Sequence, residues 1–436
     1  MLILDFNDSE LRFAQNGKEL ASAPGFAVLE GNEFILGAAA AAKSRLNPRA
    51  TYRNFWEQLD QQPLNRAAGR AQSHADIAYF HLQDLWKKVC ARTGGSPESV
   101  IVVVPSQYGA ERLSLLLGIA GACAIPVQGV VDSAVLAASA QAHLPCQYLD
   151  ISQHRVYRSE VGVDGAVQSA DELGQQGLMW CFEQCIKWIA ARFMAETRFD
   201  PLHEAVSEQR LFDELPRWLS GFADADRLPL SLTAGQRQHQ IEVSRGQLIE
   251  QLQPLYQAIE GAVQHSKGAI LLSHRFSVLP GLKDYLNARV LAADAVFTVA
   301  AARATEILSD SHSPVWVKHL PPQTAGDAVA ALHTPDSAAR TTVHPMATHV
   351  LHRHSAYPLG LGGLALGAEP SADAAGEGSA CVLVEGGRVV LKACANGREL
   401  RINGNVWSGT ERSLQLGDEV QYGPERYQLI CVRGGH

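Results

Sequence analysis

The run from Val100 to Val104 constrains the fold most strongly, because it is an unbroken series of β-branched residues ended by Pro105. Such a run predicts a buried strand. Patterns typical of helices stand on both sides, at 76–89 and 106–122. A further strand, 124–130, and a further helix, 133–142, follow. The alternation predicts an α/β domain.

Two apolar segments end in an aspartate and continue through a polar turn into a second strand. The first runs from Leu2 to Asp5 and returns through Glu10–Ala14 before the turn Asn16-Gly17. The second joins 146–149 to 156–161. Both patterns predict β-hairpins.

In their order, these segments resemble the ATPase domain of the seventy-kilodalton heat-shock chaperones, in the actin and hexokinase superfamily. Leu36-Gly37-Ala38, Asn47-Pro48 and Val100–Pro105 are similar to segments of that family, in the family's order. The resemblance covers residues 1–318. It implies a two-lobed, actin-like α/β fold with duplicated ribonuclease-H-like lobes.

The positions that the family uses to hold phosphate are altered. The first hairpin turn, D-L-G-T-T in the family, is Asp5-Phe6-Asn7-Asp8-Ser9 here. Asn7 stands at the glycine, and Asp8 adds a charge that should repel phosphate. The family's catalytic lysine falls on Trp56, where an indole cannot stabilise phosphoryl transfer. We expect Trp56 to be a packed aromatic on a helix.

The second hairpin turn and the adenosine segment are altered too. The family's D-L-G-G-G-T becomes Asp150–Arg155, without its glycines. His154 and Arg155 there could attract an anion or be solvated turn residues. The paired glycines beside the purine become His274 and Arg275. Side chains at these bends should leave no cradle for a triphosphate.

Asp5 and Asp150 are the carboxylates that remain at the family's metal-side positions. They could hold a hydrated magnesium ion, or they could receive backbone amides at the hairpin tips. The candidate cleft residues are therefore Asp5, Asn7, Asp8, Trp56, Asp150, His154, His274 and Arg275.

A different architecture is predicted beyond residue 318. The interval 319–345 is rich in alanine, threonine and proline and predicts a linker. Short strand patterns with glycine-rich turns then predict an all-β sandwich over 346–436. The strings Arg401–Val406 and Leu414–Val420 resemble the ending of forkhead-associated domains.

That second resemblance does not carry phosphothreonine recognition with it. The family's arginines and histidine are missing at Leu366-Gly367-Ala368 and at Ser379–Val382. His344, His349, His352 and His354 gather near the start of this region. His352 and His354 are weak metal candidates, since cysteine or carboxylate ligands at matching spacing are absent, and we expect no metal. Cys181 and Cys185 lie one helical turn apart and are expected to be buried thiols.

Charge and hydropathy limit the classes of partner. The 436-residue chain has a net charge of -8 and no basic block, which argues against nucleic-acid binding. It shows no signal-peptide pattern and no apolar run of membrane length. We expect a cytoplasmic protein without membrane insertion.

The sequence thus favours a non-catalytic, heat-shock-like pseudo-ATPase that serves as a protein-binding scaffold or assembly factor. No cofactor is expected, and the partner is a protein whose identity the sequence does not give. The alternative is a chaperone-like weak ATPase that binds ATP and magnesium through Asp5 and Asp150.

Overall fold

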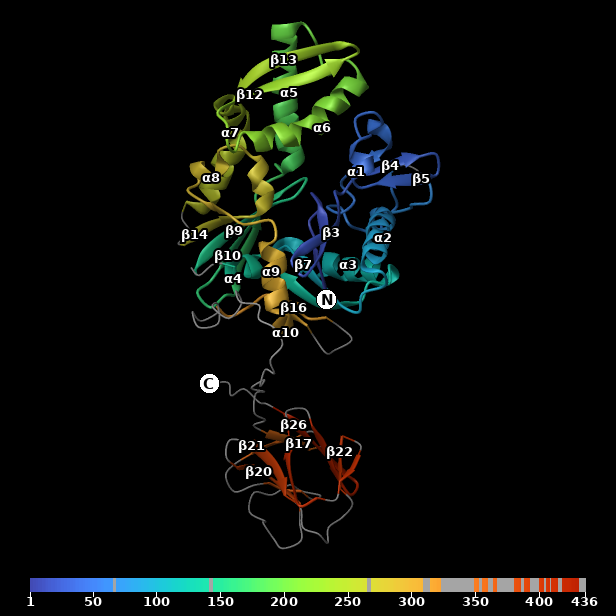
Figure 1. Ribbon diagram of the computed structural model, residues 1–436, viewed down its shortest axis with the longest axis vertical. Helices are drawn as coiled ribbons and strands as arrows, with labels where there is room; N and C mark the ends of the chain where they lie inside the picture. Colours follow the sequence, from blue (N-terminus) through green and yellow to red (C-terminus); the bar gives the residue numbers. More distant parts are fainter. Residues whose placement is uncertain are drawn as a thin grey trace. The chain divides into compact units, whose positions relative to one another are not determined.

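The computed structural model describes residues 1–65, 68–140, 144–264, 268–308 and 314–322, and parts of 349–430: 349–352, 355–359, 364–366, 380–385, 388–392, 400–403, 405–407, 409–414 and 418–430. The chain divides into two compact units, Met1–Thr334 and Pro335–His436. Figure 1 shows the first in blue to yellow and the strands of the second in red.

A mixed sheet forms the base of the first unit, in the order β16-β8-β7-β1-β2-β3. β1 pairs antiparallel with β2 and parallel with β7, which confirms the first predicted hairpin and the buried strand. Its strands are β1 (Leu2–Asp5), β2 (Leu11–Gln15), β3 (Lys18–Ala23), β7 (Val100–Val104), β8 (Val127–Asp132) and β16 (Trp316–Val317).

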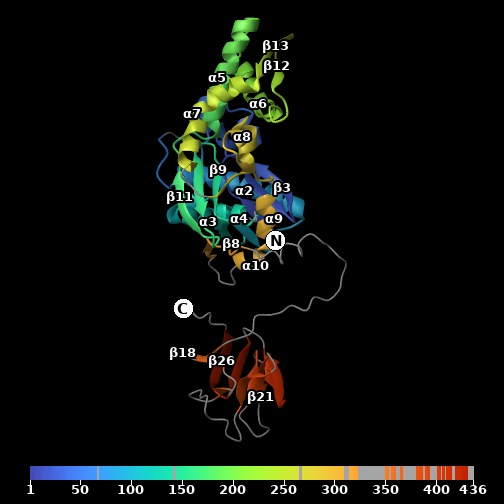
Figure 2. The same ribbon diagram turned by 90° about the vertical axis from the view of Figure 1, so that its left-hand side faces the viewer.

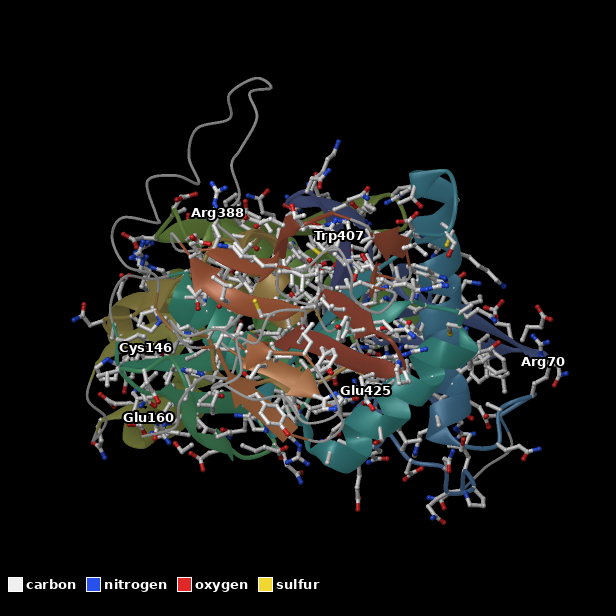
Figure 3. All side chains as sticks on the ribbon, turned by 90° about the horizontal axis from the view of Figure 1, so that it is seen from below. Arg70, Cys146, Glu160, Arg388, Trp407 and Glu425 are labelled. Carbon is white, nitrogen blue, oxygen red and sulfur yellow. The ribbon has the colours of Figure 1, made fainter. Side chains whose placement is uncertain are left out.

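A second mixed sheet repeats this arrangement in the order β11-β10-β9-β14-β15. β9 pairs antiparallel with β10 and parallel with β14, which confirms the second hairpin. Figure 3 labels Cys146 and Glu160 on the adjacent strands β9 and β10. The strands are β9 (Cys146–Ile151), β10 (Val156–Val161), β11 (Val167–Glu172), β14 (Ala269–Leu272) and β15 (Arg289–Val290).

Helices cover both faces of the first sheet. Leu2 and Leu4 point to a core shared with α2 (His74–Thr93) and α3 (Ala110–Ala122). Ile3 points to the opposite core, shared with α4 (Ser133–Ser139) and α9 (Ala295–Ala302). This alternation is what a strand buried on both faces requires.

Helix α4 lies between the two sheets. Val135 and Leu136 belong to the core of the first sheet, whereas Ala134 and Ala137 contact the core that contains Tyr148 of the second. Small alanines let the helix approach closely. Asp132 caps α4 by accepting a hydrogen bond from the N–H of Ala134 at 2.8 Å.

Longer helices cover the other face of the second sheet and extend beyond it, as Figures 1 and 2 show. They are α5 (Leu178–Thr197), α6 (Ala205–Gly221) and α7 (Arg245–Val263), with the hairpin of β12 (Arg227–Ala234) and β13 (Arg237–Ser244). Ser244 caps α7 in a capping box with Gln247, as its position predicts. Cys181 and Cys185 are buried, and burial raises the pKa of both thiols.

Short elements complete the first unit: β4 (Ala27–Glu30), β5 (Glu33–Leu36), β6 (Thr51–Tyr52), α1 (Ala38–Ala41), η1 (Pro48–Ala50), η2 (Ser106–Tyr108), η3 (His274–Val278), α8 (Leu282–Tyr285) and α10 (Ala304–Ile307). The helix expected over 106–122 is interrupted at Gly109, whose φ of 63° is outside the helical region. Trp56 lies in a turn, and the expected helix is not formed there.

The start of the predicted linker belongs to the first unit. Leu320 is buried, and its N–H donates to the carbonyl of Gly165. The rest of 319–345, from residue 323, lies outside the described residues.

The described part of the second unit forms two antiparallel sheets around one hydrophobic core. β17 (His349–His352) pairs antiparallel with β18 (Ser355–Pro358). The others are β19 (Leu364–Ala365), β20 (Cys381–Glu385), β21 (Arg388–Lys392), β22 (Leu400–Ile402), β23 (Asn405–Trp407), β24 (Glu411–Leu414), β25 (Glu419–Tyr422) and β26 (Glu425–Ile430).

Asn403 links the two strings that carry the forkhead-associated resemblance. Its side chain donates to Asp418 and accepts from the N–H of Glu419, both at 2.8 Å. Among the described residues, no helix is long and apolar enough to cross a membrane.

Candidate functional site

The tips of the two hairpins meet between the sheets of the first unit. The side-chain amide of Asn7, beyond β1, donates to Asp150 Oδ2 at 3.0 Å and to the carbonyl of Ile151 at 3.2 Å. Asn7 and Asp150 are each about 2% exposed. The residue at the first glycine position therefore joins one hairpin to the other.

Arg275 bridges the carboxylates of Asp5 and Asp150. Its Nη2 lies 2.6 Å from Asp5 Oδ2, and its Nη1 lies 3.2 Å from Asp150 Oδ2. Burial alone would lower the pKa of Arg275, but the two carboxylates outweigh it and raise that pKa. The guanidinium thus supplies the positive charge between two carboxylates that a metal ion would supply.

A second arginine supports this centre from β2. Arg12 Nη1 lies 3.8 Å from Asp5 Oδ2 and 3.1 Å from His274 Nε2, and it donates to the carbonyl of Ala293. Burial and the neighbouring charges of Arg275 and Arg12 lower the pKa of His274 to about 3. His274 is therefore a neutral acceptor for Arg12 near neutral pH.

Asp8 forms a second direct link between the hairpins. Its Oδ1 accepts from the N–H of Gln153 at 2.8 Å, and its carbonyl accepts from Gln153 Nε2 at 2.7 Å. Burial raises the pKa of Asp8, although His154 and the Gln153 N–H act in the opposite direction. Gly25 approaches this contact so closely that an added Cβ would lie 2.7 Å from the Asp8 carbonyl oxygen.

The second hairpin turn directs its carbonyls at the N-terminus of α5. The N–H groups of Leu178 and Met179 donate to the carbonyls of Ser152 and Gln153, each at 2.9 Å. Amides at a helix N-terminus can bind anions, and these two are already occupied by the chain itself.

His154 and Arg155 lie at the rim of the cleft and not at its centre. His154 Nε2 is 3.0 Å from the carbonyl of Arg53. Arg155 contacts Glu57 at 2.8 Å and Glu172 at 3.0 Å. Both side chains thus have partners in the chain.

Trp56 is 2% exposed and stands edge-on to Phe6, with ring centroids 5.0 Å apart. Its indole N–H donates to His81 Nδ1 at 3.3 Å, and His81 Nε2 is 2.9 Å from the carbonyl of Pro24. An indole only donates and a carbonyl only accepts, so the ring of His81 carries its proton on Nε2. Burial lowers the pKa of His81 to about 4, consistent with a neutral ring.

Little open space remains at the hairpin tips. A cavity of about 20 Å³, lined in part by Asn7, Asp8 and Trp56, lies beside them. A space of that size holds about one water molecule. Within the described residues, no group of three or more His, Cys, Asp or Glu side chains is placed to hold a metal ion.

The weak metal candidates of the second unit are placed differently. His352 is buried against Tyr427, with its Nε2 3.3 Å from Glu425 and its Nδ1 3.0 Å from the carbonyl of Arg426. Both ring nitrogens therefore face protein groups. His354 and His344, the loop 367–379 and the side chain of His349 lie outside what the structure describes.

Sequence reasoning found Asp5, Asn7, Asp150 and Arg275 but missed their partners. Arg12 carries a detectable signal, because it is a charged residue between the apolar Leu11 and Phe13 of a strand. In the sequence, Gln153 indicates only that a glycine is absent from the second hairpin turn. Its contact with Asp8 depends on the tertiary fold. His81 carries no local signal, since a histidine on an apolar helix face is common.

No family model and no curated protein matches this chain.

Proposed function

We propose that the first unit is a degenerate heat-shock-like ATPase domain that serves as a non-catalytic protein scaffold. The repeated sheet order supports two ribonuclease-H-like lobes of the actin-like kind, because each sheet combines an antiparallel hairpin with parallel strands in the same order. Fold alone does not fix function, so the proposal depends on the cleft.

One observation carries the proposal: Arg275 bridges Asp5 and Asp150. Magnesium bound by these carboxylates would have to displace a guanidinium that is itself buried and hydrogen-bonded. Expelling it costs more than an ordinary side-chain movement, because the charges are desolvated. The direct contact of Asp8 with Gln153 also fills the place where the hairpin turns would surround a phosphate.

A scaffold of this kind has its two lobes held in a fixed relation. Asn7, Asp8 and Arg275 each connect one sheet with the other through buried polar contacts. A rigid pair of lobes presents a constant surface to a protein partner, and binding then loses little conformational entropy. The second unit would supply another contact surface.

Calorimetric titration of the full chain with ATP and magnesium tests the proposal. We expect no saturable heat and no rise in melting temperature at millimolar ATP, since binding would stabilise the folded state by mass action. Micromolar binding would overturn the proposal and favour the weak ATPase. Replacing Trp56 with lysine should not produce turnover, because the contacts of Asp8 and Arg275 remain.

The scaffold role needs a positive test as well. A protein that co-purifies with the full chain from its native cell should be purified and the complex reconstituted. We expect the same dissociation constant with and without ATP and magnesium. An affinity that changes several-fold with nucleotide would contradict a nucleotide-independent scaffold.

A further inference from the structure

A polar groove of about 460 Å³ lies at the rim of the closed cleft. Its walls include Glu57, from the segment before α2, Arg112, on α3, and Arg155, in the second hairpin turn. The groove therefore spans both sheets of the first unit. The groove is open, whereas side chains fill the centre of the cleft.

The groove adjoins the 20 Å³ cavity described above, because Glu57 and Arg112 line both spaces. Tyr108 and Tyr157 form part of the wall of this inner cavity. Arg112 thus borders both the groove and the cavity that the two tyrosines line.

Arg112 differs from the other charged residues of this wall. Glu57 is paired with Arg155 at 2.8 Å, and Asp8 accepts from Gln153. In contrast, no hydrogen bond or ion pair joins Arg112 to any group in the described part of the chain. Arg112 is a residue of intermediate exposure that lines open space, so its positive charge is available to an anionic ligand.

Tyr108 supplies an independent observation. The residue is only 6% exposed, and its hydroxyl has no hydrogen-bond partner among the described residues. Burial raises the pKa of Tyr108 and of Tyr157, and the nearby charge of Arg112 opposes both shifts. Both hydroxyls therefore keep their protons near neutral pH; that of Tyr108 is free to donate, whereas that of Tyr157 is hydrogen-bonded to the Ser152 side chain.

We propose that this groove and its inner cavity bind a carboxylate of a protein partner, with Arg112 as its ion-pair partner and the Tyr108 hydroxyl as a donor. The proposal rests on the scaffold function and specifies what the scaffold recognises. The inner cavity holds about one water and so admits one oxygen of the ligand, and the single guanidinium of Arg112 suits a singly charged carboxylate. The carboxylate belongs to an acidic side chain or to a chain terminus.

The test uses the full chain with 13C at the ring ε positions of tyrosine, titrated with sodium acetate at constant ionic strength. Y108F and Y157F assign the two signals. We expect both signals to shift and saturate in the millimolar range, and R112Q to weaken binding by about tenfold or more. R92Q, which removes an exposed arginine from α2, is the matched control and should bind acetate as the wild type does.

Three outcomes would overturn the proposal. They are the absence of a saturable shift in the folded wild type, equal binding by wild type and R112Q, and inorganic phosphate binding as tightly as acetate. If acetate binds, N-acetylglutamate methylamide and N-acetylalanine then distinguish an acidic side chain from a chain terminus. The ATP titration does not involve Arg112, so failure of this site and failure of the scaffold proposal are separate results.

Discussion

Arg275, at the centre of the cleft, and Arg155, at its rim, each contact two carboxylates. Arg275 lies 2.6 Å from Asp5 and 3.2 Å from Asp150, and its side chain is 5% exposed. Arg155 lies 2.8 Å from Glu57 and 3.0 Å from Glu172, with a side chain that is 22% exposed. The two arginines thus have similar distances to their carboxylates, but the side chain of Arg275 is more deeply buried than that of Arg155.

That difference separates a structural lock from a surface contact. Water can hydrate the carboxylates at the rim when their arginine is removed, so the cost of breaking them is small. At the centre, loss of Arg275 would leave Asp150 as a buried charge without a cation and Asp5 with only the more distant Arg12. Ion pairs with similar distances can therefore differ in how much they stabilise the folded protein.

The largest expected effect is that of R275A. Removing the guanidinium leaves the buried Asp150 without a cation and Asp5 with only Arg12 at 3.8 Å, and we expect the free energy of unfolding to fall by about 3–5 kcal/mol. Urea unfolding at constant pH and salt measures this loss. Without Arg275, a cation could bind between Asp5 and Asp150, so the unfolding of this variant should be measured with and without magnesium.

A neutral centre is the control for R275A. The triple variant D5N, D150N and R275M removes all three charges and keeps similar volumes, so it should recover most of the lost stability. A loss below about 1 kcal/mol in R275A would show that the central pair behaves like the rim pair, which would remove the basis of the comparison.

The next largest effect depends on pH and concerns His274, which lies at the centre of the cleft. The pKa of His274 is about 3 in the folded protein and 6.5 in its ordinary state, so only the unfolded chain takes up this proton between those values. Stability from His274 is complete above pH 6.5 and is lost as the pH falls toward 3. Between pH 6.5 and 4 the wild type should lose about 3 kcal/mol more than H274Q, because each pH unit contributes about 1.4 kcal/mol.

His81 titrates in the same direction in both proteins and cancels from this difference, as does any other group that both proteins share. Unfolding curves at several pH values give the result. Parallel pH profiles for wild type and H274Q would mean that the histidine beside Arg275 is hydrated in solution.

The sequence predicted the local parts of this centre and not the bridge itself. The hairpins and the Val100–Val104 strand follow from alternation and β-branching, which act over a few residues. The contact between Arg275 and Asp5 joins residues 270 positions apart. The resemblance places Arg275 at a glycine of the chaperone family and so predicts an altered cradle, but the direction of its side chain depends on how the sheets meet.

The sequence also left two uses for Asp5 and Asp150, a magnesium ion or backbone amides. Asp150 does accept from a backbone amide, that of Ile151 at 2.9 Å, and it also pairs with Arg275. A third use, pairing with a buried cation from the chain, does not follow from the loss of glycine, which by itself indicates only steric exclusion. Charge complementarity between distant substitutions was the missing signal.

Gly25 gives a smaller test of how tightly the centre is closed. In G25A the new Cβ would lie 2.7 Å from the Asp8 carbonyl oxygen, which is backbone and cannot rotate away. We expect a loss of about 1–3 kcal/mol from overpacking. G246A is the matched control, because no atom lies within 4 Å of its Cβ in α7, and it should stabilise by about 0.5–1 kcal/mol. Equal effects of the two substitutions would argue against close contact between the hairpins.

The smallest expected effect is that of R155Q at the rim. Glu57 and Glu172 become hydrated when Arg155 is lost, so the free energy of unfolding should change by about 1 kcal/mol or less. The effect should decrease further between low salt and about 1 M salt, where charges are screened beyond roughly 3 Å, whereas the loss in R275A should persist because its charges are buried. Urea unfolding of both variants at the two salt concentrations makes the comparison directly. If the two losses fell in parallel with salt, the centre would have to be accessible to ions, and a nucleotide with magnesium could then reach Asp5 and Asp150.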